Sequence, residues 1–369
     1  MKRPHLTPLS RTVHPGAWWL WALALAVAAS RTTNPLLLAM LLGVAGLVVA
    51  RRRGTAPWAL AFRMYLWLGA FIVVMRVLFR VIFGGGEGEH VLFTLPAVPL
   101  PEWSAGIRLL GPVAAEELLG GLYDGLRLAA MVVCVGAANA LANPKRMLKA
   151  LPGALHEVGT SVVVTLTVAP QLAESVVRVR RARRLRGRRT RGLRALHGIA
   201  VPVLEDAMNR SLALAAAMAA HGFGRTGQLP VRTRVLTGAL VIGGLLGVCA
   251  GLYGAMGSGG PAGLGTPVLL AGLLLAVAGF LLGGRRVVRS TYRPDRWRAA
   301  ELLVTACGLA AAALMYAAAG SQAAVLHPTT SPLMWPEVTP LPAVAVLLAS
   351  LPAWAAPAPP RPTVQEAPA

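Results

Sequence analysis

The segment from Pro170 to Gly227 reads PQLAESVVRVRRARRLRGRRTRGLRALHGIAVPVLEDAMNRSLALAAAMAAHGFGRTG, and it is the one long polar, charged interruption in an otherwise apolar chain. Its first half carries ten arginines and no acidic residue between Arg178 and Arg194. In its second half, residues 211–220 are mostly small, and small residues allow helices to approach one another closely. The segment therefore offers charge in one half and close contact in the other.

The composition indicates a membrane protein that crosses the bilayer several times. Of its 369 residues, 56% are hydrophobic and only 14% are charged, and the mean hydropathy is +0.61. This is too apolar for a soluble protein of this length. The net charge of +22 sits in short blocks between apolar runs, as the positive-inside rule describes for cytoplasmic loops. The blocks favour membrane lipids over nucleic acid as partners, because basic segments beside a bilayer attract anionic lipid.

Apolar runs predict the spanning helices, which we expect at residues 17–29, 35–50, 58–83, 118–142, 235–253, 267–282, 299–319 and 341–354. The first run could also be part of a signal peptide. Pro35, however, begins a second run within a few residues, which favours an antiparallel pair of helices. Lys2, Arg3 and the arginines at 51–53 place the N-terminus and the end of the second run in the cytoplasm.

The segments between these runs are harder to assign. Residues 84–117 are rich in glycine, proline and glutamate and predict an external loop. Alternation at residues 91–98 suggests a strand, but we reject it because a lone strand has no ladder and proline interrupts it. Residues 158–168 lie between two basic segments and are too few to cross the membrane and return, so they predict a re-entrant or interfacial helix.

The third apolar run contains three arginines, Arg63, Arg76 and Arg80. They cannot all face lipid, because a central arginine costs about 2.5–3.5 kcal/mol on the insertion scale. Arg76 and Arg80 are four residues apart and share a helix face. They are expected to face the protein interior or to extend toward the membrane interface; the alternative is contact with a partner subunit.

A spaced set of motifs in the central segment resembles the transmembrane T component of energy-coupling factor (ECF) transporters, the family that includes the cobalt permease subunit. The matching positions are Pro170, Leu172, Glu174, Ala182-Arg183-Arg184, Pro202 and Ala217-Met218-Ala219-Ala220-His221-Gly222-Phe223-Gly224. His221 departs from the pattern, since the family usually has arginine there. The resemblance covers about residues 15–253 and implies an all-α polytopic integral membrane protein with long cytoplasmic coupling helices.

The resemblance also implies partners and a site. T components of this family sit in the bacterial cytoplasmic membrane, where Ala-Arg motifs dock into two ABC-type ATPase subunits and transmit their closure to a substrate-binding membrane subunit. The cargo would be a vitamin or a transition-metal ion such as cobalt or nickel. Carried over to this chain, the ATPase-coupling interface consists of Ala182, Arg183, Arg184, Ala220, His221 and Gly222. His221 could instead cap the C-terminus of its helix, and as a docking residue its charge would vary near neutral pH.

The residues themselves support a helix with a docking end. Leu172, Val176 and Val179 form an apolar stripe at helical spacing that, continued, reaches Ala182 and Arg183. The alternative to docking is a basic helix bound to lipid headgroups. This alternative is preferred for four of the arginines: Arg180, Arg188, Arg189 and Arg191.

A second helix is predicted to begin at Pro202, with Glu205 and Asp206 at the positive end of its dipole. The spacing of Leu204, Met208, Leu212 and Ala215 gives this helix a narrow face suited to tight crossing, with the first helix as one candidate partner.

The sequence predicts no catalytic residue, cofactor or metal site. The three lysines are Lys2, Lys145 and Lys149, and none follows a glycine as the phosphate-binding GxxxxGK[ST] motif needs. ATP hydrolysis is therefore expected in partner subunits. Residues 222–227 match GxGxxG, but they follow a helix and are interpreted as its glycine C-cap. Cys134, Cys249 and Cys307 lie in apolar runs and are expected to be small core residues.

We expect a T-component-like domain over residues 1–257 with the coupling helices at about 170–227, extra transmembrane helices over 258–356, and a disordered tail over 357–369. Two other functions stay open. One is a self-contained secondary transporter or channel that uses the intramembrane arginines. The other is a membrane scaffold that binds anionic lipid or nucleic acid through its arginine run, with nucleic-acid binding that weakens steeply with salt.

Overall fold

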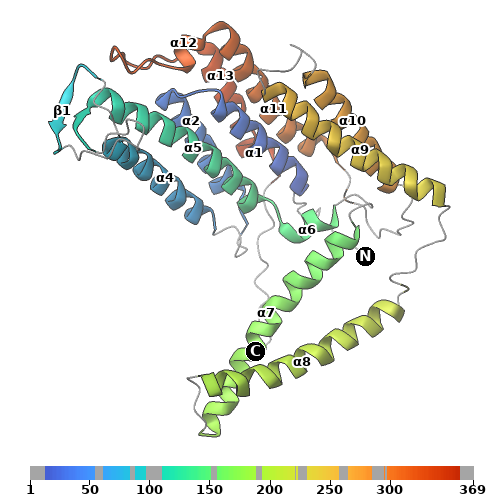
Figure 1. Ribbon diagram of the computed structural model, residues 1–369. Coiled ribbons are helices and arrows are strands. Elements are labelled where there is room, and N and C mark those ends of the chain that lie inside the picture. Colours follow the sequence, from blue (N-terminus) through green and yellow to red (C-terminus); the bar gives the residue numbers. More distant parts are fainter. Residues whose placement is uncertain are drawn as a thin grey trace, which may run out of the picture. The chain divides into compact units, whose positions relative to one another are not determined.

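The described part of the chain is almost entirely helical (Figure 1). The structure is a computed structural model that describes residues 13–54, 61–83, 88–96, 110–150, 156–187, 193–220, 222, 231–256, 265–284, 295 and 297–357. Within these residues, seven helices are long and apolar enough to cross a membrane. The chain is therefore an all-α polytopic membrane protein, as its composition predicts.

The chain divides into two compact units, one of residues 1–147 with 293–369 and one of residues 148–292. The described helices of the first unit are α1 (Pro15–Ser30), α2 (Pro35–Arg52), α4 (Phe62–Phe83), α5 (Ala115–Leu141), α6 (Pro144–Lys149), α11 (Ala299–Ser321), α12 (Ala323–Leu326), α13 (Pro340–Leu348) and α14 (Pro352–Ala355). Those of the second are α7 (His156–Leu185), α8 (Leu193–Ala220), α9 (Val231–Met256) and α10 (Gly265–Gly284).

The core of the first unit lies among α1, α2, α5 and α11. Trp21, Leu25, Leu38 and Met315 are fully buried there. The first two helices begin at prolines, whose missing N–H would be unpaired in any case. Asn34 Oδ1 accepts a hydrogen bond from Leu36 N at 3.0 Å and so caps α2. These starts define the two helices that the first two apolar runs predict.

Helix α4 packs along α5 through glycines of α5. A Cβ at Gly125 would lie 3.0 Å from Val73 Cα, and one at Gly136 would lie 2.5 Å from Tyr65 Cβ. The absence of side chains at these positions lets the two backbones approach closely. The opposite face of α4 is apolar and exposed, with Trp67 68% exposed, as expected of a helix side that faces lipid.

The segment after residue 293 belongs to the same compact unit as the first helices. Trp21 Nε1 donates to Ala349 O at 3.1 Å, and Asn34 Nδ2 donates to Glu337 O at 2.8 Å. Arg52 Nη2 donates to Ala353 O, also at 2.8 Å. Side-chain hydrogen bonds thus fasten the segments around α13 and α14 onto α1 and α2.

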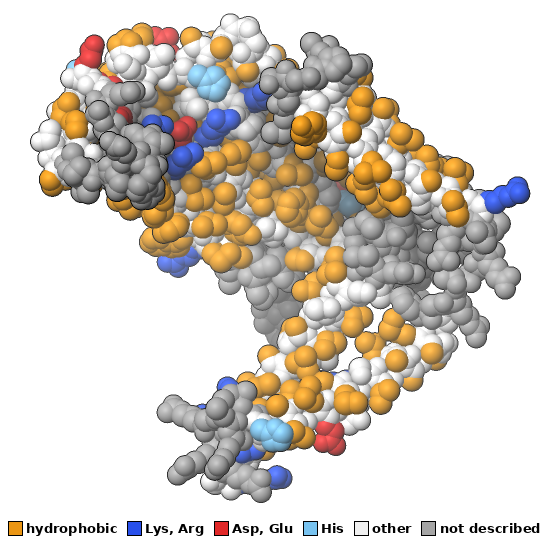
Figure 2. Space-filling model, viewed as in Figure 1, with side chains coloured by type: hydrophobic (Ala, Val, Ile, Leu, Met, Phe, Trp, Pro, Cys, Tyr) orange, Lys and Arg blue, Asp and Glu red, His pale blue; other side chains and the backbone are white. Residues whose placement is uncertain are grey.

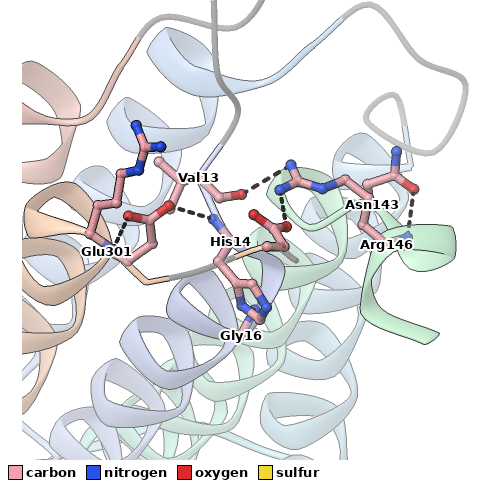
Figure 3. Close-up of polar contacts among 8 residues, drawn as sticks. Val13, His14, Gly16, Asn143, Arg146 and Glu301 are labelled. Atoms are coloured by element: carbon pink, nitrogen blue, oxygen red, sulfur yellow. Dashed lines mark hydrogen bonds and ion pairs between the residues drawn. The ribbon is translucent and has the colours of Figure 1, made fainter. Parts of the chain in front are cut away.

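A polar network joins three distant parts of the chain at the end of the bundle that leads into α6 (Figure 3). His14 N donates to Glu301 Oε1 at 3.3 Å, and Arg298 N donates to Glu301 Oε2 at 2.9 Å. The Arg146 guanidinium pairs with the Asp295 carboxylate and also contacts the carbonyl oxygen of Val13. Arg146 lies in α6, just before the chain enters the second unit.

The expectation of a strandless loop over residues 84–117 is wrong. Strands β1 (Val91–Thr94) and β2 (Pro112–Ala114) pair antiparallel, with Thr94 opposite Pro112. The strand that we rejected thus does form, and it pairs with β2, which follows it in the chain. Glu116, also assigned to that loop, lies in the first turn of α5 and accepts a hydrogen bond from His90 N at 3.2 Å.

Helices α9 and α10 form a close pair in the second unit. A Cβ at Gly244 would lie 2.6 Å from Ala276 Cα, and one at Gly272 would lie 2.5 Å from the carbonyl carbon of Gly247. Glycines on both helices therefore permit the contact. Cys249 of α9 is exposed, which corrects the prediction that all three cysteines are core residues; Cys134 and Cys307 are buried.

Several predicted helices differ from the structure. The run at 341–354 forms two short helices, α13 and α14, and neither it nor the run at 17–29, which forms α1, is among the seven candidate spans. Residues 158–168 are not a separate short helix: they open the 30-residue helix α7, which continues through Pro170 and meets the length and hydropathy of a membrane span. Helix α8 begins at Leu193, so Pro202 lies inside it and not in its first turn. Proline removes one backbone hydrogen bond inside a helix, and α8 nevertheless continues through Pro202 while it packs against α7.

Candidate functional site

The two helices that carry the family motifs, α7 and α8, pack against each other. Leu172, Val176 and Val179 of α7 are half-buried, and Ser175 on the same face is 2% exposed. The predicted stripe therefore does form the contact face. It continues to Arg183, which is half-buried, whereas Ala182 is exposed.

Four polar side chains join the helices across this face, and we name them the α7–α8 clamp: Gln171, Ser175, Asp206 and Arg210. Ser175 Oγ donates to Asp206 Oδ2 at 2.8 Å. Arg210 Nε donates to Asp206 Oδ1 at 3.1 Å, and its Nη1 donates to Gln171 Oε1 at 3.4 Å. The clamp thus ties the residues around the first family motif to the middle of α8.

The clamp holds its central carboxylate ionised. The hydrogen bond from Arg210, together with that from Ser175, lowers the pKa of Asp206 below its usual value. Asp206 does not lie at the N-terminus of its helix, as predicted from Pro202, because α8 begins earlier. Its charge is therefore matched by Arg210, not by a helix dipole.

The register of the pair is antiparallel. Gln171, Ser175 and Arg183 of α7 lie opposite Arg210, Asp206 and Gly198 of α8, in reverse order. The C-terminal motif of α7 begins about 10 Å beyond Ser175, at 1.5 Å per residue. The C-terminal end of α8 lies about 20 Å beyond Asp206, in the opposite direction. The two motifs are thus held at opposite ends of one helix pair.

Arg183 is packed against the backbone of α8. A Cβ at Gly198 would lie 2.8 Å from Arg183 Cζ, so only glycine leaves room for the guanidinium in this position. Arg183 Nε is buried and has no hydrogen-bond partner among the described residues. Arg184, next to it, is exposed. Of the two arginines, Arg184 presents its charge outward and Arg183 lies in the helix contact.

Both motif-bearing helices are followed by glycines with left-handed backbones. Gly187 has φ +67° and follows α7, and Gly222 has φ +72° and follows α8. Gly222 N donates to Ala219 O at 3.0 Å. This geometry is a glycine C-cap, as predicted for the GxG run. Ala220 is the exposed last residue of α8, and His221 lies outside the described residues.

A face of α8 turned away from α7 is apolar and uncovered within the described part of the chain. Leu204, Met208 and Leu212 follow one another at intervals of four and are each more than 60% exposed. These are the residues for which tight crossing with α7 was considered. The contact with α7 instead uses Gly198, Asp206 and Arg210 of α8.

The fold defines a class: an all-α polytopic membrane protein, here with a packed pair of helices, α7 and α8, that carries the sequence motifs. A family model described as CbiQ, cobalt transport protein, matches residues 9–231, more than half of the chain. The chain therefore belongs to the CbiQ cobalt transport protein family, the family of ECF T components. The match includes both helices of the pair and ends where α9 begins. No curated protein matches the sequence.

Sequence reasoning missed Gln171, Ser175, Arg210 and Gly198. One signal was present for Ser175, a polar residue between Leu172 and Val176 on an otherwise apolar stripe. Gln171 and Gly198 depend on the antiparallel register, which brings Gln171 to Arg210 and Gly198 to Arg183. Arg210 pairs with Asp206 at i,i+4, a local spacing that could have been noticed in the sequence.

Proposed function

We propose that this chain is the energy-coupling transmembrane subunit of an ECF-type ABC importer. It links ATP hydrolysis in two partner ATPase subunits to a separate membrane subunit that binds the substrate, and it has no ATPase activity of its own. The observation that carries the proposal is the clamp, which makes one antiparallel unit of α7 and α8 and holds a family motif at each end. Two separated docking ends are what two ATPase subunits require.

The docking residues act through small size and charge. At the end of α7, the exposed Ala182 allows a partner backbone to approach, while Arg184 offers a guanidinium to a partner carboxylate and Arg183 supports the helix contact. At the end of α8, Ala220, His221 and Gly222 form the second docking point. Removing one partner of a hydrogen-bonded, buried charge pair at an interface costs about 2–5 kcal/mol. Loss of Arg184 should therefore weaken ATPase binding strongly, and loss of Arg183 should weaken it by disturbing the helix contact.

The clamp converts docking into movement. Ser175 and Asp206 meet between the two docking ends, so a displacement at Arg184 reaches α8 through this contact. We assign the exposed row Leu204, Met208 and Leu212 to the substrate-binding membrane subunit. Because both ends of the helix pair bind ATPase subunits, α8 moves when those subunits close. Its exposed apolar row then moves the substrate-binding subunit that it contacts.

The membrane and cargo assignments follow from the family and the charge pattern. The chain would sit in the bacterial cytoplasmic membrane with its N-terminus in the cytoplasm, because Lys2, Arg3 and the arginines at 51–53 flank the first two helices on the same side. The cargo would be a transition-metal ion such as cobalt, or a vitamin. Cargo selection would lie in the partner membrane subunit.

Co-purification with the candidate ATPase pair tests the proposal. The wild-type chain, the Arg183→Glu/His221→Glu variant and an Arg184→Glu variant would be solubilised in detergent, and both captured ATPase and ATP hydrolysis would be measured. Arg180→Glu is the matched control, since Arg180 is an exposed arginine of α7 outside the motif. We expect the control to capture as much ATPase as wild type and the motif variants to capture little. Equal capture by all four chains would refute the proposed interface.

A further inference from the structure

Two arginines of α4, Arg76 and Arg80, lie where a membrane helix should be apolar. Helix α4 is 22 residues long and is one of the seven candidate spans. Arg76 is seven residues from its last residue, Phe83, which is roughly 10 Å at 1.5 Å per residue. Arg80 is one turn closer to that end. Both side chains are exposed.

The charges of this pair are poorly compensated by the described protein. Arg80 Nη2 lies 3.7 Å from Asp124 Oδ2 of α5, and the side chains of both remain partly exposed. Among the described residues, none forms a hydrogen bond or an ion pair with Arg76. Asp124 thus compensates Arg80 only, and the Arg76 guanidinium has no carboxylate partner among the described residues. An uncompensated charge within the apolar layer is unfavourable, and such residues typically find a partner of opposite charge.

Glycines of α5 fix where the two arginines lie. A Cβ at Gly121 would be 2.7 Å from Arg80 Cγ, and a Cβ at Gly125 would be 3.2 Å from Arg76 Cβ. The aliphatic stems therefore run along the seam between α4 and α5, and the guanidinium groups emerge from it. Figure 2 shows blue side chains beside a red one in the region of α4 and α5, next to a broad hydrophobic band.

The surface around this seam is suited to lipid. Phe79 and Phe83 stack with ring centroids 5.7 Å apart and are each at least 50% exposed, and Val74 is 62% exposed. A ligand bound at this seam must therefore have an apolar part that lies against α4. It must also have an anionic group at the level of Arg76 and Arg80, one to two helical turns before the end of α4. A phospholipid has this form, and arginine forks bind phosphate oxygens in two-point geometry.

We propose that the seam between α4 and α5 binds an anionic phospholipid, with Arg76 and Arg80 holding its phosphate and the exposed apolar face of α4 lining its acyl chains. Asp124 keeps Arg80 in place and leaves the pair with a net positive charge. The site is independent of the coupling interface, because it uses neither α7 nor α8. It gives the exposed arginines of this span a role that is separate from transport of an ion.

Lipid retention and thermal stability of the purified chain test this site. The chains are wild type, Arg76→Gln/Arg80→Gln, Arg76→Lys/Arg80→Lys, and Arg63→Gln as the matched control, because Arg63 is an exposed arginine near the other end of the same helix. Native mass spectrometry counts bound lipids. Unfolding midpoints are then compared with added phosphatidylglycerol, phosphatidylcholine or inorganic phosphate.

We expect the wild type and Arg63→Gln to retain phosphatidylglycerol and to be stabilised by it more than by phosphatidylcholine. Each basic residue near an anionic headgroup strengthens binding roughly fivefold, so the double glutamine variant should bind about 25-fold more weakly. The double lysine variant should bind phosphatidylglycerol with intermediate affinity. If this variant folds normally, weaker binding cannot be attributed to loss of structure. Equal lipid retention by the wild type and the double glutamine variant would overturn the proposal. So would equal stabilisation by inorganic phosphate, which would indicate a site for a free anion.

Discussion

Ser175 Oγ and Asp206 Oδ2 lie 2.8 Å apart and join the middle of α7 to the middle of α8. Ser175 is almost completely buried, so its hydroxyl has little access to water and depends on this carboxylate. The contact lies between the motif at the end of α7 and the motif at the end of α8. Under the proposed function, it is therefore the point where movement at one end of the helix pair would pass to the other.

Replacing Ser175 by alanine should loosen the helix pair. The loss of one buried hydrogen bond costs about 1 kcal/mol, which raises the population of separated helices roughly fivefold. Spin labels on the exposed residues Val177 and Leu204 would report a broader distance distribution in Ser175→Ala. Ser211→Ala is the control, because Ser211 Oγ donates to Met208 O within its own helix. An unchanged distribution in Ser175→Ala would show that the clamp does not hold the pair.

The helix contact should also depend on pH. Arg210 and Ser175 lower the pKa of Asp206 in the folded chain. A carboxyl group with a lowered pKa contributes stability that is fully present above its unfolded pKa, about 3.9, and is lost as pH falls through the folded value. The same label pair should therefore separate on acidification below about pH 4. Asp206→Asn should remove this acid step, and a variant that keeps it would assign the step to other groups.

Gly198→Ala should impair docking while it improves the intrinsic helix propensity of α8. Alanine is favoured over glycine in a helix interior by about 1 kcal/mol, yet its Cβ would collide with the Arg183 guanidinium. We expect reduced ATPase capture with unchanged or increased helix content by circular dichroism. Gly238→Ala is the control, since no atom of the described residues lies within 4 Å of a Cβ at that helical glycine. Unchanged capture in Gly198→Ala would mean that the position of Arg183 is irrelevant.

The ion pair between Arg146 and Asp295 should contribute to the stability of the first unit. Arg146 also contacts the carbonyl oxygen of Val13, so it ties the N-terminal segment and the segment before α11 to α6. Arg146→Asp or Asp295→Arg alone should lower the unfolding free energy by about 1 kcal/mol, the upper range for a partly exposed pair. The double reversal should recover most of this loss. No recovery would mean that the ion pair itself contributes little.

Much of the fold follows from local sequence, and the clamp does not. Apolar runs locate six of the seven candidate spanning helices, because a long apolar segment must either be buried or face lipid. The seventh, within α7, was expected to be re-entrant or interfacial. The β-hairpin was missed because the partner of Val91–Thr94 lies at Pro112–Ala114 and has no strand pattern of its own. Pro202 misplaced the start of α8, since tertiary packing sustains a helix through a proline. The contact between Asp206 and Ser175 depends on the register of α7 against α8, and this register cannot be predicted from a local sequence pattern.

Site-specific photo-crosslinking in the assembled complex is the most direct test of energy coupling by this chain. A photoreactive amino acid would replace Arg184 at the end of α7, Ala220 at the end of α8, or Trp67 of α4, which is 68% exposed and serves as the control. We predict that positions 184 and 220 each crosslink to an ATPase subunit and that position 67 does not. If neither position 184 nor position 220 reaches an ATPase, while the complex still hydrolyses ATP and transports its cargo, the coupling role of the α7–α8 pair is contradicted.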